Sequence, residues 1–297
     1  KTLNERAPEE ARAFGSAIAE LAGPAADMAR VSETTIERPD GKVGLRVLVP
    51  IDAPRGVLVY YHGGGWVLGS IDESDTLARK IAERTSCAVV LVEYRLAPEH
   101  PYPTAVDDSY AALEWVGNNL TSIAGSEVPL IVAGDSAGGN LAAVMAIRAR
   151  DRGGPSIALQ VLIYPVTDAD LSRPSYDDPE NQLLLTKHAM RWFWNHYVPE
   201  STRRTEPDAS PLRTEDLSEP PPAVVLTAEY DVLRDEGEAY AERLKQANVS
   251  TDLWRIPGQM HGFFTLLMLP GSERGFQQVV KAVKACIAKA RRVQAIK

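Results

Sequence analysis

The sequence predicts an α/β fold in which helices cover both faces of a mostly parallel central sheet. Short apolar runs such as Val57–Tyr61 and Val89–Val92 alternate with longer segments of helical periodicity. Continuous apolar runs are typical of strands that are buried on both faces. An alternation of strands and helices favours a parallel sheet. The 297 residues suit one large domain of this kind, with or without an insertion.

Apolar runs and helical periodicity also place the individual elements along the chain. The predicted strands are Leu45–Val49, Gly56–Tyr61, Ala88–Tyr94, Leu130–Ala133, Ala158–Tyr164, Ala223–Thr227 and Leu253–Ile256. The predicted helices between them are Ser74–Arg84, Ala105–Asn118, Gly138–Arg150 and Glu236–Ala247. Right-handed crossovers leave the carboxyl ends of parallel strands on one edge of the sheet, so we expect the functional side chains there.

The C-terminal segment 271–297 is basic, with seven Lys or Arg residues against the single acid Glu273. Apolar residues recur through it at helical spacing: Phe276, Val279, Val280, Val283 and Ile287. This pattern predicts a terminal helix with one buried stripe and a solvated basic face. A helix lying on a membrane surface is the alternative, but the stripe is no wider than a core-facing one.

Composition and charge exclude several classes of function. The formal net charge of −8 argues against a nucleic acid as the main partner. No apolar stretch approaches the length of a membrane span, so no transmembrane helix is expected. Cys87 and Cys286 belong to no metal-binding motif, and the sequence predicts no metal site. We interpret them as two free thiols in a reducing compartment, which predicts a cytoplasmic protein.

Two segments interrupt the alternation of strands and helices. Residues 1–30 contain a helix candidate, Pro8–Leu21, and residues 166–220 contain an aromatic helix. We interpret both as a helical cap over the edge of the sheet where the functional side chains are expected. This divides the chain into 1–30 (cap), 31–165 (core), 166–220 (cap insertion and return) and 221–297 (core). The large side chains expected to roof the site are Phe14, Trp192, Phe193, Trp194 and Tyr197. The alternative is that these aromatics belong only to the core.

The segment Gly134–Gly139 carries the strongest chemical signal. It reads Gly-Asp-Ser-Ala-Gly-Gly, follows an apolar strand and precedes a helix. A serine on such a sharp turn projects its hydroxyl above the sheet, and the crowded backbone requires small residues two positions to either side. The following helix directs backbone N–H groups toward a developing negative charge. Ser136 is therefore the predicted nucleophile.

The run His62–Trp66 contains three consecutive glycines directly after a predicted strand. Glycines let the backbone approach a substrate carbonyl and present N–H donors to it. A flexible turn is the alternative interpretation. His62 itself is expected to organise this loop rather than to act as a base, because it begins the glycine run.

An acid is expected after a later strand of the sheet. Asp231 follows the strand at Ala223–Thr227 closely and is the predicted acid of a triad. Asp235 is the alternative acid. Its other interpretation is an N-terminal cap for the helix that begins near Glu236.

The base is expected last in the chain. His261 lies in a glycine-flanked loop after the strand Leu253–Ile256. The order serine, acid, histidine is that of the α/β-hydrolases, which differs from the chymotrypsin and subtilisin orders. The other candidate histidines precede Asp231 in the chain: His100, His188 and His196.

Together these segments resemble the hormone-sensitive lipase family of esterases, also called bacterial family IV. The matching segments are His62–Trp66, Tyr94–Pro103, Gly134–Gly139, Ala228–Asp235 and Met260–Phe263. Because Asp135 precedes Ser136, the chain resembles the subgroup of this family that carries Gly-Asp-Ser-Ala-Gly. Val232 departs from the family, in which a proline is common at this position. The resemblance implies an α/β-hydrolase fold with a helical cap, and a Tyr94–Pro103 segment that braces the loop beneath the site.

The resemblance also implies residue roles and an activity. Ser136 would be the nucleophile, His261 the general base and Asp231 its orienting acid. The oxyanion donors would be the backbone N–H groups of Gly64, Gly65 and Ala137. The implied enzyme is a carboxylesterase for short- to medium-chain esters that needs no cofactor or metal.

Two other functions fit the same resemblance. One is a different acyl hydrolase on the same site, such as an arylformamidase or a drug-ester hydrolase. The other is a non-catalytic binding protein like the gibberellin receptors, which lack the triad histidine that this chain retains. Members of the family often dimerise, so a homodimer is the assembly that the resemblance implies.

Overall fold

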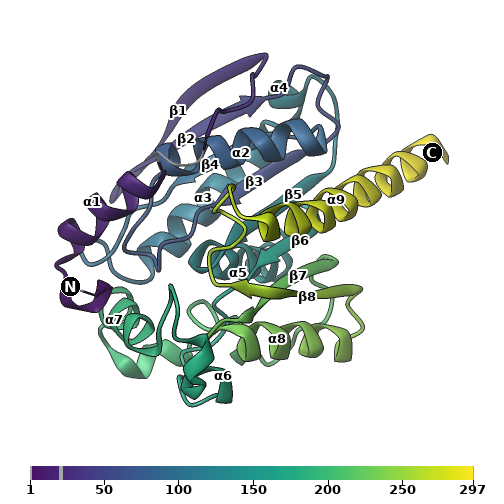
Figure 1. The fold of residues 1–297 in the computed structure, drawn as a ribbon. Coiled ribbons are helices and arrows are strands. Elements are labelled where there is room, and N and C mark those ends of the chain that lie inside the picture. The colour runs from purple at the N-terminus through teal and green to yellow at the C-terminus, as the bar shows by residue number, and fades with distance from the viewer. Residues whose placement is uncertain (1, 20–22, 297) are drawn as a thin grey trace.

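The computed structural model of the protein describes residues 2–19 and 23–296 and centres on one eight-stranded sheet (Figure 1). The order across the sheet is β1-β2-β4-β3-β5-β6-β7-β8. The strands are β1 (Arg30–Arg38), β2 (Gly41–Val49), β3 (Val57–Tyr61), β4 (Ala88–Glu93), β5 (Leu130–Asp135), β6 (Ile157–Ile163), β7 (Ala223–Tyr230) and β8 (Thr251–Met260). The α-helices are α1 (Pro8–Ala19), α2 (Ile71–Thr85), α3 (Thr104–Asn118), α4 (Leu120–Ala124), α5 (Ala137–Arg152), α6 (Pro174–Asp177), α7 (Lys187–Tyr197), α8 (Arg234–Gln246) and α9 (Pro270–Ile296).

The sheet is mostly parallel, as predicted. Strand β2 runs antiparallel to β1 and β4, and every later neighbouring pair is parallel. Strand β1 was not among the predicted strands. Most of its residues are exposed, so it lacks the apolar run that identified the other strands. Its pairing with β2 along the outer edge of the sheet defines it instead.

Helices cover both faces of the sheet. Leu58 and Tyr60 of β3 belong to one buried cluster, which α2 and α9 complete, whereas Val57 and Val59 belong to the cluster completed by α3, α5 and α8. The predicted stripe of α9 is buried at Phe276, Val279, Val283 and Ile287, while most of the basic side chains of the helix are exposed. The terminal helix therefore packs on the core, and its C-terminal end reaches the margin of the molecule (Figure 1).

Two segments gather beside the sheet, the chain start and the stretch that carries α6 and α7 (Figure 1). The predicted helix Pro8–Leu21 is present as Pro8–Ala19, and its last two positions lie outside the described residues. Helix α7 begins after Thr186, whose side chain accepts a hydrogen bond from Ala189 N and so satisfies a terminal donor.

Arg12 anchors the N-terminal segment to the core. Its Nε donates to Val67 O at 2.8 Å, and its Nη2 donates to Ala97 O at 2.9 Å. The same guanidinium binds both carboxylate oxygens of Glu99, at 3.0 and 2.7 Å. Val67 lies two residues after the last glycine of the run, and its N–H bonds Gly64 O, so α1 is tied directly to that loop.

Glu236 is buried where α8 meets the beginning of the 166–220 segment. Its carboxylate accepts hydrogen bonds from Thr167 N at 2.8 Å and from the Tyr176 hydroxyl at 2.9 Å. Burial raises the pKa of Glu236 from 4.5 to about 8, because desolvation disfavours the charged form. Between about pH 4.5 and pH 8, folding therefore binds a proton at this position.

The glutamine variant Glu236→Gln should gain stability relative to the wild type as pH rises. A carboxyl with a raised folded-state pKa stabilises the fold fully below about 4.5, and that stability is lost as pH rises through about 8. Thermal unfolding at pH 5, 7 and 9 should show a growing melting-temperature difference in favour of the variant. The exposed Glu242→Gln change serves as the control. A difference that does not vary with pH would contradict the prediction.

Candidate active site

Ser136 occupies a strained turn between β5 and α5. Its backbone angles are φ 55° and ψ −117°, a conformation rarely found for a residue with a side chain. Glycine is required on both sides of the turn, at Gly134 and Gly138, because neither position has room for a β-carbon. A β-carbon on Gly134 would overlap the backbone of Gly138, and one on Gly138 would overlap the carbonyl of Tyr61. The predicted strand–turn–helix context of the serine is therefore present.

Ser136, His261 and Asp231 lie in one line of contacts. The distance from His261 Nε2 to Ser136 Oγ is 3.0 Å, and His261 Nδ1 lies 2.8 Å from Asp231 Oδ2. The other carboxylate oxygen of Asp231 accepts a hydrogen bond from Leu233 N at 2.9 Å. All three side chains are buried. They follow β5, β7 and β8, so the carboxyl edge of the parallel sheet brings together residues up to 125 positions apart.

Asp235, the alternative acid, has different partners. Its carboxylate accepts hydrogen bonds from Ser175 N at 2.8 Å and from Arg234 Nε at 3.1 Å. The predicted capping role of Asp235 is wrong, because α8 begins at Arg234 after Leu233 and Asp235 lies inside the first turn. Its position lets it tie α8 to α6 instead.

The glycine loop after β3 faces Ser136 across a cavity of about 380 Å³, which Gly64, Gly65 and His261 also line. Gly64 and Gly65 have φ values of 112° and 61°, which favour glycine. The loop is closed by hydrogen bonds from Val67 N and Leu68 N to Gly64 O. Ala137, the third predicted donor, is the buried first residue of α5.

Asp135 connects the glycine loop to the serine turn, a role that was not predicted from the sequence. Its Oδ1 accepts hydrogen bonds from Gly63 N at 3.0 Å and from the Tyr60 hydroxyl at 2.7 Å. Burial raises the pKa of this carboxyl. The signal in the sequence was an acidic residue next to the predicted nucleophile for which no catalytic role was predicted.

His62 organises the loop, as expected. Its Nδ1 lies 2.7 Å from Gly63 O, and its ring stacks on Tyr94 with 4.4 Å between centroids. The Tyr94 hydroxyl donates to His62 O at 2.8 Å, and Ala97 N donates to Trp66 O at 2.9 Å. The Tyr94–Pro103 segment therefore braces the loop from below, in agreement with its predicted role.

Among the aromatic side chains of α7, Phe193 lines the cavity with Ser136 and would collide with any side chain at Gly65. The expectation that Trp194 and Tyr197 also roof the serine is wrong. Both are fully buried against Trp66, and the Tyr197 ring stacks on it at 4.1 Å. Trp192 does not line this cavity, and the side chain of Phe14 lies outside the described residues.

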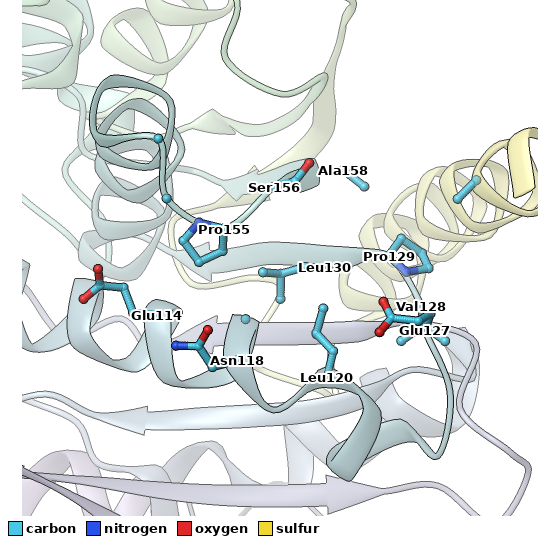
Figure 2. A pocket seen from close by; sticks show the side chains of 14 residues that line it. Glu114, Asn118, Leu120, Glu127, Val128, Pro129, Leu130, Pro155, Ser156 and Ala158 are labelled. Atoms are coloured by element: carbon cyan, nitrogen blue, oxygen red, sulfur yellow. The ribbon is translucent and has the colours of Figure 1, made fainter.

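A larger cavity, of about 770 Å³, lies at the opposite edge of the sheet (Figure 2). Its walls include Leu130 and Ala158, near the starts of β5 and β6, with Glu114 and Asn118 of α3. Parallel strands present their functional groups at their carboxyl ends. This cavity is therefore remote from Ser136, His261 and Asp231.

A family model described as an alpha/beta hydrolase fold matches residues 58–265, more than half of the chain. The chain belongs to this α/β-hydrolase family. The carboxylesterase NlhH of Mycobacterium tuberculosis is 45% identical over 235 residues, which cover 78% of this chain and 74% of the relative. The ethyl acetate hydrolase of Pseudomonas putida is 37% identical over 286 residues, which cover 94% of this chain and 90% of the relative.

Solved structures agree with this assignment. An esterase from Pyrobaculum calidifontis superposes with a TM-score of 0.86 at 40% identity, covering 95% of this chain and 94% of the other. A thermostable esterase from Pseudomonas putida superposes with a TM-score of 0.89 at 36% identity, covering 97% of this chain and 92% of the other. The predicted fold and the predicted ester-hydrolase class are confirmed: this α/β-hydrolase is a serine carboxylesterase. Within the described residues, no helix has the length and hydropathy of a membrane span.

Proposed function

We propose that the enzyme hydrolyses short- to medium-chain carboxylic esters with Ser136 as nucleophile, His261 as general base and Asp231 as its orienting acid. The observation that carries this proposal is the unbroken line of contacts of 3.0 and 2.8 Å through the three side chains. That line ends at the hydroxyl on the strained turn, inside a cavity large enough for a small ester.

In the proposed reaction, Ser136 Oγ attacks the ester carbonyl while His261 Nε2 takes its proton. Asp231 holds the imidazole with Nδ1–H directed at its carboxylate. The N–H groups of Gly64, Gly65 and Ala137 stabilise the oxyanion. His261 returns the proton to the departing alcohol, which leaves an acyl-enzyme. A water molecule activated by His261 then attacks the acyl-enzyme, releases the acid and restores the Ser136 hydroxyl.

The cap is assigned to residues 1–30 and 166–220, and the catalytic core to 31–165 and 221–297. The position of the cavity supports this division. Residues from both proposed cap segments line it alongside the catalytic groups: Leu3, Arg6, Ala11, Leu184, Leu185 and Phe193. A cavity closed by both segments provides a bounded, largely apolar slot for the substrate.

A bounded slot predicts an optimum in acyl-chain length. Each methylene that fits should gain about 0.8 kcal/mol, and each one beyond the wall should cost about 1–3 kcal/mol in overpacking. With p-nitrophenyl esters, kcat/KM should rise from acetyl to a maximum at butyryl or hexanoyl and then fall. Phe193→Ala should move the maximum to longer chains, whereas the exposed Leu183→Ala should not.

A preference of the wild type for palmitoyl over butyryl esters would contradict the proposed slot. A formamide and an amide in the same panel test the alternative acyl hydrolases. Faster turnover of the formamide than of every ester would favour an arylformamidase.

The assembly and location of the enzyme are also proposals. The implied homodimer can be tested by native mass spectrometry of the full chain. A cytoplasmic location is supported by Cys87 and Cys286, which are both free thiols, and can be tested by cell fractionation. The net charge of −8 supports the absence of nucleic-acid binding.

A further inference from the structure

The turn after β6 carries a second strained residue next to the nucleophile. Tyr164 directly follows this strand and has φ 34°, in the left-handed region that residues with a side chain rarely adopt. It is 1% exposed, and it lines the catalytic cavity together with Ser136 and His261. Strain of this kind persists only where surrounding contacts hold the residue in place, and it concentrates at functional sites.

Backbone hydrogen bonds hold this turn against Ser136. Tyr164 N donates to Leu226 O of β7 at 2.6 Å. On one side of Tyr164 in the chain, Ile163 O accepts a hydrogen bond from Ser136 N at 2.8 Å. On the other side, Val166 N donates to Ser136 O at 3.2 Å. The same turn therefore binds both backbone polar groups of the nucleophile, and Tyr164 lies between the two contacts.

The Tyr164 ring contacts the loop that carries the base. Its centroid lies 4.6 Å from that of the His261 imidazole, with 55° between the planes, and Phe263 meets it edge-on at 5.5 Å. Contacts to Asp231 and Ser136 at the two ring nitrogens fix the edges of the His261 imidazole, but they leave its faces unsupported. The Tyr164 ring fills the space on one side of the imidazole, so the base cannot tilt in that direction.

The ring, rather than the hydroxyl, is the part of Tyr164 that is suited to act on the base. The hydroxyl oxygen is buried next to Thr265, so it is not accessible to the substrate. Burial raises the pKa of Tyr164 well above its ordinary range, and the Asp135 carboxylate raises it further, because both disfavour the phenolate. The side chain therefore stays neutral and neither gives nor takes a proton during the reaction.

We propose that Tyr164 is a positioning residue, whose ring supports the imidazole of His261 while the turn that carries it holds Ser136. One residue thereby maintains the distance of 3.0 Å between His261 Nε2 and Ser136 Oγ through acylation and deacylation. A misplacement of about 1 Å can cost about 10²-fold in rate, so loss of this support should lower kcat. The role rests on the proposed functions of Ser136 and His261.

Two variants separate the ring from the hydroxyl. Tyr164→Phe keeps the ring and should leave kcat for p-nitrophenyl butyrate close to that of the wild type. Tyr164→Leu removes the ring and should lower kcat about 10- to 100-fold at matched fractions of folded protein. Tyr240→Leu, at a fully buried tyrosine of α8 outside the cavity, is the matched control. It should lower the melting temperature and leave kcat of the folded fraction unchanged.

A proton resonance reports the alignment of the base without any substrate. The Nδ1–H that His261 directs at Asp231 should give a low-field ¹H signal, identified by its absence in His261→Ala. The wild type and Tyr164→Phe should share this signal. Tyr164→Leu should broaden or lose it, because a mobile imidazole exchanges this proton with water.

The proposal would be overturned if folded Tyr164→Leu kept the wild-type kcat or the wild-type resonance. It would also be overturned if Tyr164→Phe lost as much activity as Tyr164→Leu, because the hydroxyl would then be responsible. If the leucine variant does not fold, Tyr164→Met replaces it under the same criteria. None of these results would affect the assignment of the nucleophile, which Ser136→Ala tests separately.

Discussion

Replacement of Ser136 by alanine is expected to lower kcat about 10⁶-fold, the scale found when a triad nucleophile is removed. Without Oγ, His261 has no hydroxyl to deprotonate and no acyl-enzyme can form. The fold should be kept, because alanine removes only the hydroxyl. Steady-state hydrolysis of p-nitrophenyl butyrate measures the loss, and Ser172→Ala, an exposed serine, is the control.

Covalent labelling gives an independent check of the same residue. A phosphonate or a sulfonyl fluoride should modify Ser136 in the wild type, and peptide mass spectrometry should locate the adduct there. Labelling of a different serine would refute the assignment, even if Ser136→Ala were inactive.

Asp231→Asn is expected to reduce kcat about 10⁴-fold while preserving the fold, because an amide in place of the carboxylate favours the wrong imidazole tautomer. The carboxylate lies 2.8 Å from His261 Nδ1. An asparagine NH₂ in that position would donate to Nδ1 and leave the proton on Nε2, where Ser136 needs an acceptor. Kinetics at matched fractions of folded protein, checked by circular dichroism, measure the effect.

Asp235→Asn is the matched comparison, four residues along the chain. Its carboxylate bonds Ser175 N and Arg234, so its loss should reduce stability by about 1 kcal/mol and change kcat little. If Asp235→Asn removed activity and Asp231→Asn only lowered the melting temperature, the acid would be misassigned.

The positions of strands and helices could be predicted from the sequence wherever their buried residues form a continuous or periodic apolar pattern. The run Val57–Tyr61 is buried at every position, and the α9 stripe recurs at helical spacing. Strand β1 has no such apolar pattern because its side chains are mostly exposed. Its pairing depends on backbone hydrogen bonds to β2, which any side chain permits.

Aromatic content identified α7 but not which rings face the substrate. Phe193 points at Gly65, whereas Trp194 and Tyr197 pack on Trp66. The exposed face of α7 is polar, with His188, Arg191 and Asn195. The cavity wall and the core both lie on its buried side, so helical periodicity does not distinguish them. Likewise, a polar residue at the start of α8 fitted a cap, but the helix begins one residue before Asp235.

The sequence by itself determined the α/β class, the turn at Ser136 and the order of the serine, the acid and the histidine. These properties depend on local chemistry: glycines where the backbone is crowded, and apolar runs before each functional loop. Only the tertiary structure decided that Asp135 joins the glycine loop to the serine turn, that Arg12 anchors the N-terminal segment, and that Arg6 lines the cavity. Each of these contacts joins residues far apart in the chain. The Asp135 contact depends on how the glycine loop packs against the serine turn, and the Arg6 and Arg12 contacts depend on how the N-terminal segment packs beside that loop. No local sequence pattern predicts this packing.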